Sequence, residues 1–91
     1  MRGSGQKTAI VTAAGRGMGA AIARELAAAG YSVSLMSASG AAVELAAELG
    51  GIGMSGSVTD PADLATLVQT TRDVFGRIDA VVNNTGHPPQ G

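Results

Sequence analysis

The stretch Thr12-Ala13-Ala14-Gly15-Arg16-Gly17-Met18-Gly19 decides the fold of this 91-residue chain. The apolar run that precedes it, residues 8–11, has the pattern of a buried strand, and residues 20–26 have the pattern of a helix. A glycine-rich turn between a strand and a helix presents free backbone N–H groups and the positive end of the helix dipole to an anion. The stretch therefore predicts a phosphate-binding turn.

Strand-like and helix-like segments alternate through the rest of the chain. Further strands are predicted at residues 31–36, 52–55 and 78–82, and a helix at 41–49. A last helix starts with Asp60 as N-cap, Pro61 at the first helical position and Asp63 in the first turn. Its expected inner face consists of Leu64, Leu67, Val68, Thr71, Val74 and Phe75. Gly30 and Gly76 are expected to end helices.

The order βαβαβαβ, with largely apolar strands, predicts a parallel sheet with helices on both faces. Right-handed crossovers and a reversal after the third strand give the strand order 3-2-1-4. We therefore predict an α/β fold, a Rossmann-type doubly wound parallel sheet in the form of a half fold. Residues 1–6 are interpreted as an appended leader, and residues 7–91 as the N-terminal part of a dinucleotide-binding domain.

The composition narrows the classes of function. The chain is 45% hydrophobic with a net charge of −1, so it is expected to bury a core, and no basic surface favours nucleic acid or an anionic membrane. It has no cysteine, which excludes disulfides and thiolate metal sites and is typical of a cytoplasmic protein. No apolar run approaches the roughly 18 residues of a membrane span. His87 is interpreted as an exposed loop residue without a metal-binding role.

Two motifs carry a resemblance to a known family. Residues Thr12 to Gly19 resemble the TGxxxGxG turn of the short-chain dehydrogenase/reductase family, and Asn83-Asn84-Thr85-Gly86 resembles its NNAG motif after the fourth strand. The resemblance covers residues 7–86 and is strongest to 3-oxoacyl-(acyl carrier protein) reductase-like members. The chain departs from the pattern at Ala13, where the family has glycine, at Thr85, where it has alanine, and at Ser57, where it has Asp or Asn.

The resemblance implies a bound nicotinamide dinucleotide and a set of residues that contact it. Ser57 and Val58 are expected beside the adenine, and Asn84 near the adenosine ribose. The complete expected set is Thr12, Ala14, Gly15, Arg16, Gly17, Met18, Gly19, Ser37, Ser57, Val58, Asn84, Thr85 and Gly86. These residues also have plainer interpretations. The glycines can form a purely structural turn, Val58 can belong to the core, and the asparagines can link neighbouring strand ends.

The end of the second strand bears on which cofactor is preferred. Rossmann proteins that prefer NAD place an acidic residue there, on the ribose 2′-hydroxyl. No Asp or Glu occupies positions 36–39. The Ser37 hydroxyl and the Arg16 guanidinium are instead suited to a 2′-phosphate. We therefore expect NADP, with NAD as the alternative.

The family's catalytic Ser, its Tyr-x-x-x-Lys pair and its catalytic Asn all follow the NNAG motif. The one tyrosine of this chain, Tyr31, is not followed by Lys at the fourth position, so we expect no catalytic residue among these 91 residues. A complete enzyme, expected to be a homo-oligomer, would transfer hydride between NADP(H) and a small-molecule carbonyl or secondary alcohol, such as a 3-oxoacyl thioester. A non-catalytic nucleotide-binding module and a truncated structural fragment are the alternatives.

Overall fold

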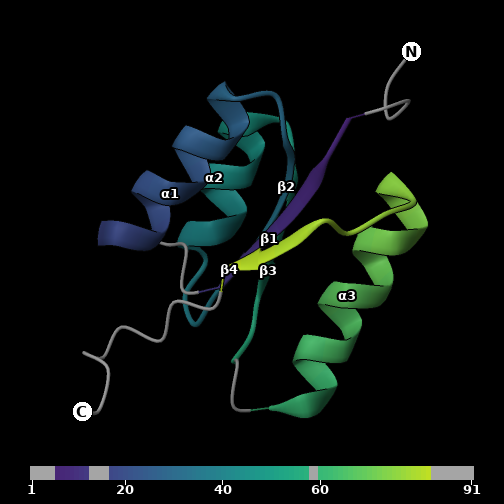
Figure 1. The fold of residues 1–91 in the computed structure, drawn as a ribbon. Helices are drawn as coiled ribbons and strands as arrows, with labels where there is room; N and C mark the ends of the chain where they lie inside the picture. Colours follow the sequence, from purple (N-terminus) through teal and green to yellow (C-terminus); the bar gives the residue numbers. More distant parts are fainter. Residues whose placement is uncertain (1–5, 13–16, 58–59, 83–91) are drawn as a thin grey trace, which may run out of the picture.

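The structure is a computed structural model that describes residues 6–12, 17–57 and 60–82. Four parallel strands form one sheet in the order β3-β2-β1-β4, as the sequence predicts. Helices α1 and α2 cover one face of this sheet and α3 covers the other (Figure 1). The elements are β1 (Thr8–Thr12), α1 (Gly17–Ala28), β2 (Ser32–Ser37), α2 (Ala41–Leu49), β3 (Ile52–Ser55), α3 (Pro61–Phe75) and β4 (Ala80–Val82).

The bounds of α2 and β3 are those that the sequence predicts, and other element boundaries differ from the prediction by one to three residues. Helix α1 begins at Gly17, three residues before the predicted start at residue 20. A glycine in the first turn does not prevent the residues that follow it from forming helical hydrogen bonds. Strand β2 starts at Ser32 and includes Ser37, and β4 starts only at Ala80. Val74 is 58% exposed, so it does not belong to the buried face of α3. It lies in the last turn of the helix, between the buried Thr71 and the half-buried Phe75.

Strand β1 forms the centre of the core. All five of its residues are buried, and it pairs with β2 on one side and β4 on the other. Alternate side chains enter different clusters, since Val11 packs with Leu35 under α1 and α2, and Ile10 packs with Met36 and Leu67 under α3. A central strand buried on both faces is typical of a parallel sheet covered by helices on both sides.

Helix α2 lies unusually close to β3 because Gly53 has no side chain. A Cβ at Gly53 would lie 2.7 Å from the Ala42 carbonyl oxygen and 2.8 Å from the Ala46 Cβ. Ala42 and Ala46 are themselves small and buried. The approach of α2 to the sheet therefore depends on small residues on both sides of the contact.

A pair of buried hydroxyl groups links α3 to the sheet. Thr71, which the periodicity places on the inner face of α3, is fully buried, and its Oγ1 lies 2.7 Å from Ser34 Oγ of β2 and 2.6 Å from the Leu67 carbonyl oxygen. Both hydroxyls thus have hydrogen-bond partners, as buried polar groups require. The contact fixes α3 against β2 within an otherwise apolar layer.

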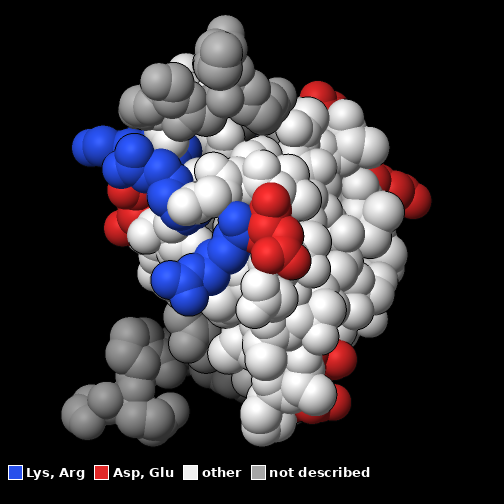
Figure 2. Space-filling model, turned by 90° about the vertical axis from the view of Figure 1, so that its right-hand side faces the viewer, with Lys and Arg blue, Asp and Glu red and all other residues white. Residues whose placement is uncertain are grey.

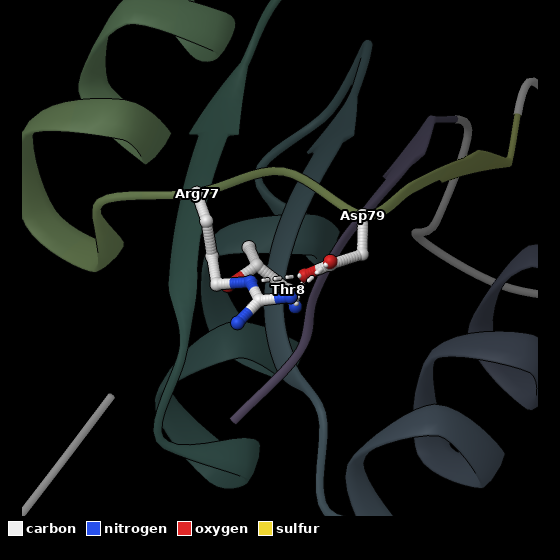
Figure 3. A network of polar contacts seen from close by, with 3 residues as sticks. All are labelled: Thr8, Arg77 and Asp79. Carbon is white, nitrogen blue, oxygen red and sulfur yellow. Dashed lines mark hydrogen bonds and ion pairs between the residues drawn. The ribbon is translucent and has the colours of Figure 1, made fainter. Parts of the chain in front are cut away.

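Asp79 joins the beginnings of β1 and β4 at the amino edge of the sheet. Its Oδ2 accepts the Thr8 N–H at 2.8 Å, and its own N–H donates to the Thr8 carbonyl at 2.9 Å. Arg77 donates to both carboxylate oxygens, at 2.8 and 2.6 Å (Figure 3). These contacts hold the pKa of the Asp79 carboxyl below its usual value, first through the Arg77 hydrogen bonds and then through the Thr8 N–H.

The side of the molecule that carries α3 presents a mostly uncharged surface, on which Lys and Arg atoms gather toward one edge (Figure 2). A largely apolar groove of about 490 Å³ follows α3. Its lining residues are Pro61, Leu64, Ala65, Val68, Gln69 and Arg72. Val81 of the edge strand β4 is 59% exposed. Arg72 is the charged residue among these lining residues, and the carboxyl edge of the sheet is the more informative place for a candidate site.

We expect the substitution Gly53→Ala to lower the free energy of unfolding by about 1–3 kcal/mol, the usual cost of overpacking a core. The added methyl group has to displace the backbone of α2. Gly40→Ala is the matched control, because a Cβ there meets no atom within 4 Å and the Gly40 φ of −76° suits alanine. Urea unfolding of both variants makes the comparison, and equal stabilities would contradict the close-approach explanation.

We expect acid to destabilise the fold partly through Asp79. Folding lowers the pKa of this carboxyl, so the unfolded chain takes up the proton more readily. The stabilising contribution is complete above the ordinary pKa of an aspartate and is lost as the pH falls through the lowered folded value.

Thermal unfolding of Asp79→Asn across the acid range tests this. The variant should be less stable near neutral pH and should lose less stability on acidification. Glu48, whose pKa is lowered by Arg24, keeps its own acid dependence. The exposed Asp73→Asn is the control, and an unchanged acid profile in Asp79→Asn would exclude the assignment.

Candidate cofactor-binding site

The carboxyl ends of the four strands lie at one edge of the sheet, where ligands of open α/β sheets bind. The chain runs outward from β1 to β2 and β3 and then returns to β4 on the other side of β1. The order therefore reverses between β1 and β4. At this point the buried Thr12 hydroxyl of β1 lies 3.4 Å from the Val82 carbonyl oxygen of β4. Thr12 thus spans the crevice where a ligand is expected.

Helix α1 opens at this same edge with Gly17. Gly17 has a φ of +65°, a left-handed conformation that glycine adopts readily and other residues rarely do. A Cβ at Gly17 would meet no atom of the described residues within 4 Å, so crowding by those residues does not explain the glycine. The requirement for glycine here is conformational.

The two residues after Gly17 face different environments. Gly19 is buried in the first turn of α1, where its small size allows the helix to pack against the sheet. Met18 is 72% exposed, which is unusual for a large apolar side chain. Met18 therefore has surface available for contact with a ligand at the helix N-terminus.

The start of α1 has features that suit an anion. Its first turn contains no acidic residue, so nothing there repels an anion. The first N–H groups of a helix have no partners inside the helix and carry the positive end of its dipole. The free N–H groups and the absence of acidic residues in this turn therefore both suit a phosphate.

Ser37 ends β2 and has a more local role than the sequence indicates. It is 7% exposed, its Oγ accepts the Ala42 N–H at 3.0 Å, and it donates to the Ser39 carbonyl at 2.8 Å. Gly40, the N-cap of α2, has no side chain to cap the helix. Ser37 supplies that cap from the strand, and its hydroxyl is thereby engaged within the protein.

Asp63 was expected only as a first-turn acid, but its carboxylate holds the segment after β3. Its Oδ2 accepts the Ser57 N–H at 3.0 Å, whereas Asp60 caps the helix itself by accepting the Ala62 N–H at 2.9 Å. A Cβ at Gly56 would lie 3.0–3.1 Å from the Asp63 carboxylate, so glycine allows this approach. Asp63 therefore fixes the position of Ser57.

The structure brings Thr12, Gly17, Gly19, Ser37 and Ser57 to the carboxyl edge, together with Met18. The remaining predicted site residues lie outside the described ranges: Ala14, Gly15, Arg16, Val58, Asn84, Thr85 and Gly86. Sequence reasoning missed Asp63 as a support of Ser57, and it missed Ser39 and Ser55. The repeated serines at the ends of β2 and β3 are the signal that could have found the last two.

Tyr31 lies at the opposite end of the molecule. It directly precedes β2 and shares a surface depression of about 300 Å³ with Gln6, Lys7 and Gly30. Within the described ranges, no three His, Asp or Glu side chains group in a way that could hold a metal ion. None of the helices in those ranges has both the length and the apolar character to cross a membrane.

Comparisons with known proteins agree with this geometry. A family model described as short chain dehydrogenase matches residues 7–91. L-fucose dehydrogenase of Rattus norvegicus is 44% identical over 87 residues, which cover 91% of this chain and 32% of that protein. The 3-oxoacyl-(acyl-carrier-protein) reductase FabG of Escherichia coli is 41% identical over 83 residues, covering 88% and 34%.

The solved structures give the same picture. A structure described as menthone neomenthol reductase from Mentha piperita superposes with a TM-score of 0.75 and 33% identity, covering 90% of this chain and 32% of that one. The chain thus spans about a third of the length of the curated relatives it matches.

We expect Gly17→Ala to destabilise the chain by about 1–2 kcal/mol, the cost of a left-handed conformation for a residue with a Cβ. Gly17→Asn should cost less, because asparagine tolerates this conformation better. A Cβ at this position meets no atom of the described residues within 4 Å, so thermal unfolding of the pair separates conformation from crowding. A larger loss in the asparagine variant would show that space decides.

Proposed function

The chain belongs to the short-chain dehydrogenase family, and from this we propose that it is the cofactor-binding part of an oxidoreductase that uses NADP(H). The observation that carries the proposal is the N-terminus of α1, which opens at the strand-order reversal with Gly17 in a left-handed conformation and no acidic residue in its first turn. Backbone N–H groups in this position bind the pyrophosphate of a dinucleotide.

We assign the other predicted residues to the rest of the cofactor. The glycine-rich turn with Ala14, Gly15 and Arg16 binds the phosphates, and Thr12 precedes it at the end of β1, where its hydroxyl lies 3.4 Å from the Val82 carbonyl oxygen of β4. Ser57 and Val58 border the adenine, with Asp63 keeping Ser57 in place through its N–H at 3.0 Å. The residues after β4 that complete the site are Asn84, Thr85 and Gly86.

The preference for NADP(H) over NAD(H) rests on charge. The described end of β2 and the loop after it, residues 36–40, contain no carboxylate that would bind a ribose hydroxyl or repel a 2′-phosphate. The position of Ser37 favours Arg16 as the main phosphate partner, since the Ser37 hydroxyl already serves Ser39 and Ala42. A guanidinium is well suited to phosphate.

A bound nicotinamide would supply the hydride chemistry, and the described residues of this chain would bind and orient the cofactor. Tyr31 is at the amino edge of the sheet, remote from the carboxyl edge, so it cannot serve as the proton donor. We therefore infer that the 91 residues alone bind the cofactor without turnover. Proton transfer is assigned to the portion of the relatives that this chain does not span.

The substrate class follows from what the relatives' names share. The name of the dehydrogenase implies removal of hydride from a hydroxyl-bearing carbon of fucose, and the names of the two reductases imply addition of hydride to the carbonyl of a 3-oxoacyl group or of menthone. We propose a small-molecule carbonyl or secondary alcohol as substrate, with a 3-oxoacyl thioester as one member of this class. We also propose a cytoplasmic homo-oligomer as the form of the complete enzyme.

Binding titrations with NADPH and NADH, followed by cofactor fluorescence, test the proposal. NADPH should bind more tightly, and Arg16→Ala should weaken NADPH by about 1–3 kcal/mol, the range for hydrogen bonds to charged groups, with NADH nearly unchanged.

Arg24→Ala is the matched control, since Arg24 also belongs to this region of the chain but pairs with Glu48 on the surface of α2. It should leave both affinities unchanged. Tighter binding of NADH by the unmodified chain would overturn the cofactor preference. Failure to bind either dinucleotide would overturn the proposed function.

A further inference from the structure

Three serines meet where β2 and β3 end. Ser37 and Ser55 are register partners on these neighbouring strands. Ser37 Oγ donates to the Ser39 carbonyl oxygen at 2.8 Å, and Ser55 Oγ donates to the same oxygen at 3.1 Å. A single carbonyl in the loop between β2 and α2 is therefore held by hydroxyls from two strands.

The rest of this loop is fixed from one side only. Ser37 Oγ and Ser39 Oγ accept the first N–H groups of α2, from Ala42 at 3.0 Å and Ala41 at 3.3 Å. These contacts are local in sequence and belong to the start of α2. Ser55 is the residue that reaches the loop from β3, 16 positions away in the chain. Its hydroxyl therefore adds a side-chain contact between the Ser39 carbonyl and β3, beside the backbone bond from the Gly56 N–H to the Ser37 carbonyl at 2.9 Å.

The two hydroxyls decide what the Ser39 carbonyl can offer a ligand. A carbonyl oxygen has two lone pairs, and both are used here. A free carbonyl at this edge would accept a hydrogen bond from a ribose 2′-hydroxyl and would repel a 2′-phosphate. Held by Ser37 and Ser55, it has no lone pair left for a ribose hydroxyl, and the two donated hydrogens reduce its repulsion of a phosphate.

We propose that Ser55 is a positioning residue that sets the preference for the 2′-phosphate by keeping the Ser39 carbonyl engaged. This inference rests on the proposed function, because it assumes that a nicotinamide dinucleotide lies along the carboxyl edge. Ser55 itself acts through Ser39 and needs no contact with the cofactor. Removal of its hydroxyl frees one lone pair of the carbonyl toward the ribose.

Direct binding titrations of the 91-residue chain with NADPH and with NADH test the inference through the ratio of the two affinities. In Ser55→Ala the ratio should fall about three- to tenfold in the direction of NADH, the equilibrium effect of losing one hydrogen bond. Ser55→Thr keeps a hydroxyl and should restore the original ratio. Ser32→Ala makes the same change at the amino end of β2 and should leave the ratio unchanged.

A second measurement needs no cofactor. Amide hydrogen exchange at Ser39 and Gly40 should be faster in Ser55→Ala than in the unmodified chain or in Ser55→Thr, because the loop has lost its contact with β3. This readout also shows whether the variant is folded.

The outcomes separate the inference from the proposal on which it rests. If the unmodified chain binds neither dinucleotide, the proposed function fails and this inference fails with it. If the unmodified chain binds NADPH and Ser55→Ala keeps its ratio, the inference alone is overturned. An equal loss of both affinities in Ser55→Ala would also overturn it, since that result indicates a structural role only.

Discussion

The contact between the Asp79 carboxylate and the Thr8 N–H is the interaction on which the arrangement of the sheet depends. It pairs the first residue of β1 with the residue just before β4, across 71 positions of sequence. The hydrogen bonds of a parallel strand pair are evenly spaced, so the register at one end of the pair also holds at the other end. The pairing of Val11 with Val82 follows from it, and so does the placement of Thr12 beside β4.

The position of α2 depends on a second constraint, the absence of a side chain at Gly53. The helix lies against β3 only because its Ala42 backbone and the Gly53 backbone can approach closely. The start of α2 is then within reach of the hydroxyls at the ends of β2 and β3. A small residue in the middle of a strand thus governs the shape of the loop at the edge where the cofactor is proposed to bind.

Local patterns in the sequence were sufficient for the strand order and for most elements. The glycine-rich turn after an apolar run predicted the β1–α1 unit, and Asp60 with Pro61 predicted the start of α3. The inner face of α3 was correct for Leu67 and Thr71, which are buried, and wrong for Val74. Periodicity gives the direction of a side chain but not how far the sheet extends beneath it.

Contacts that depend on folding could not be read from the sequence. Residues 78 and 79 were predicted to belong to the last strand, but β4 begins only at Ala80. The Asp79 carboxylate instead accepts the Thr8 N–H of β1. The two partners of the Ser37 hydroxyl within the protein, the Ser39 carbonyl in the loop and the Ala42 N–H in α2, could not be predicted either. Asp63 likewise turns back to Ser57. In each case a polar group has several acceptable partners, and only the fold selects among them.

The location of the Asp79 cluster at the amino edge has a consequence for how such a chain can change over evolutionary time. The residues that keep the strands aligned are spatially separate from the loops that would recognise a cofactor. Mutations in those loops can therefore accumulate without disturbing strand alignment, which is an advantage for diversification. The alignment of the strands at the amino edge can therefore stay the same in related chains whose loops recognise a different cofactor.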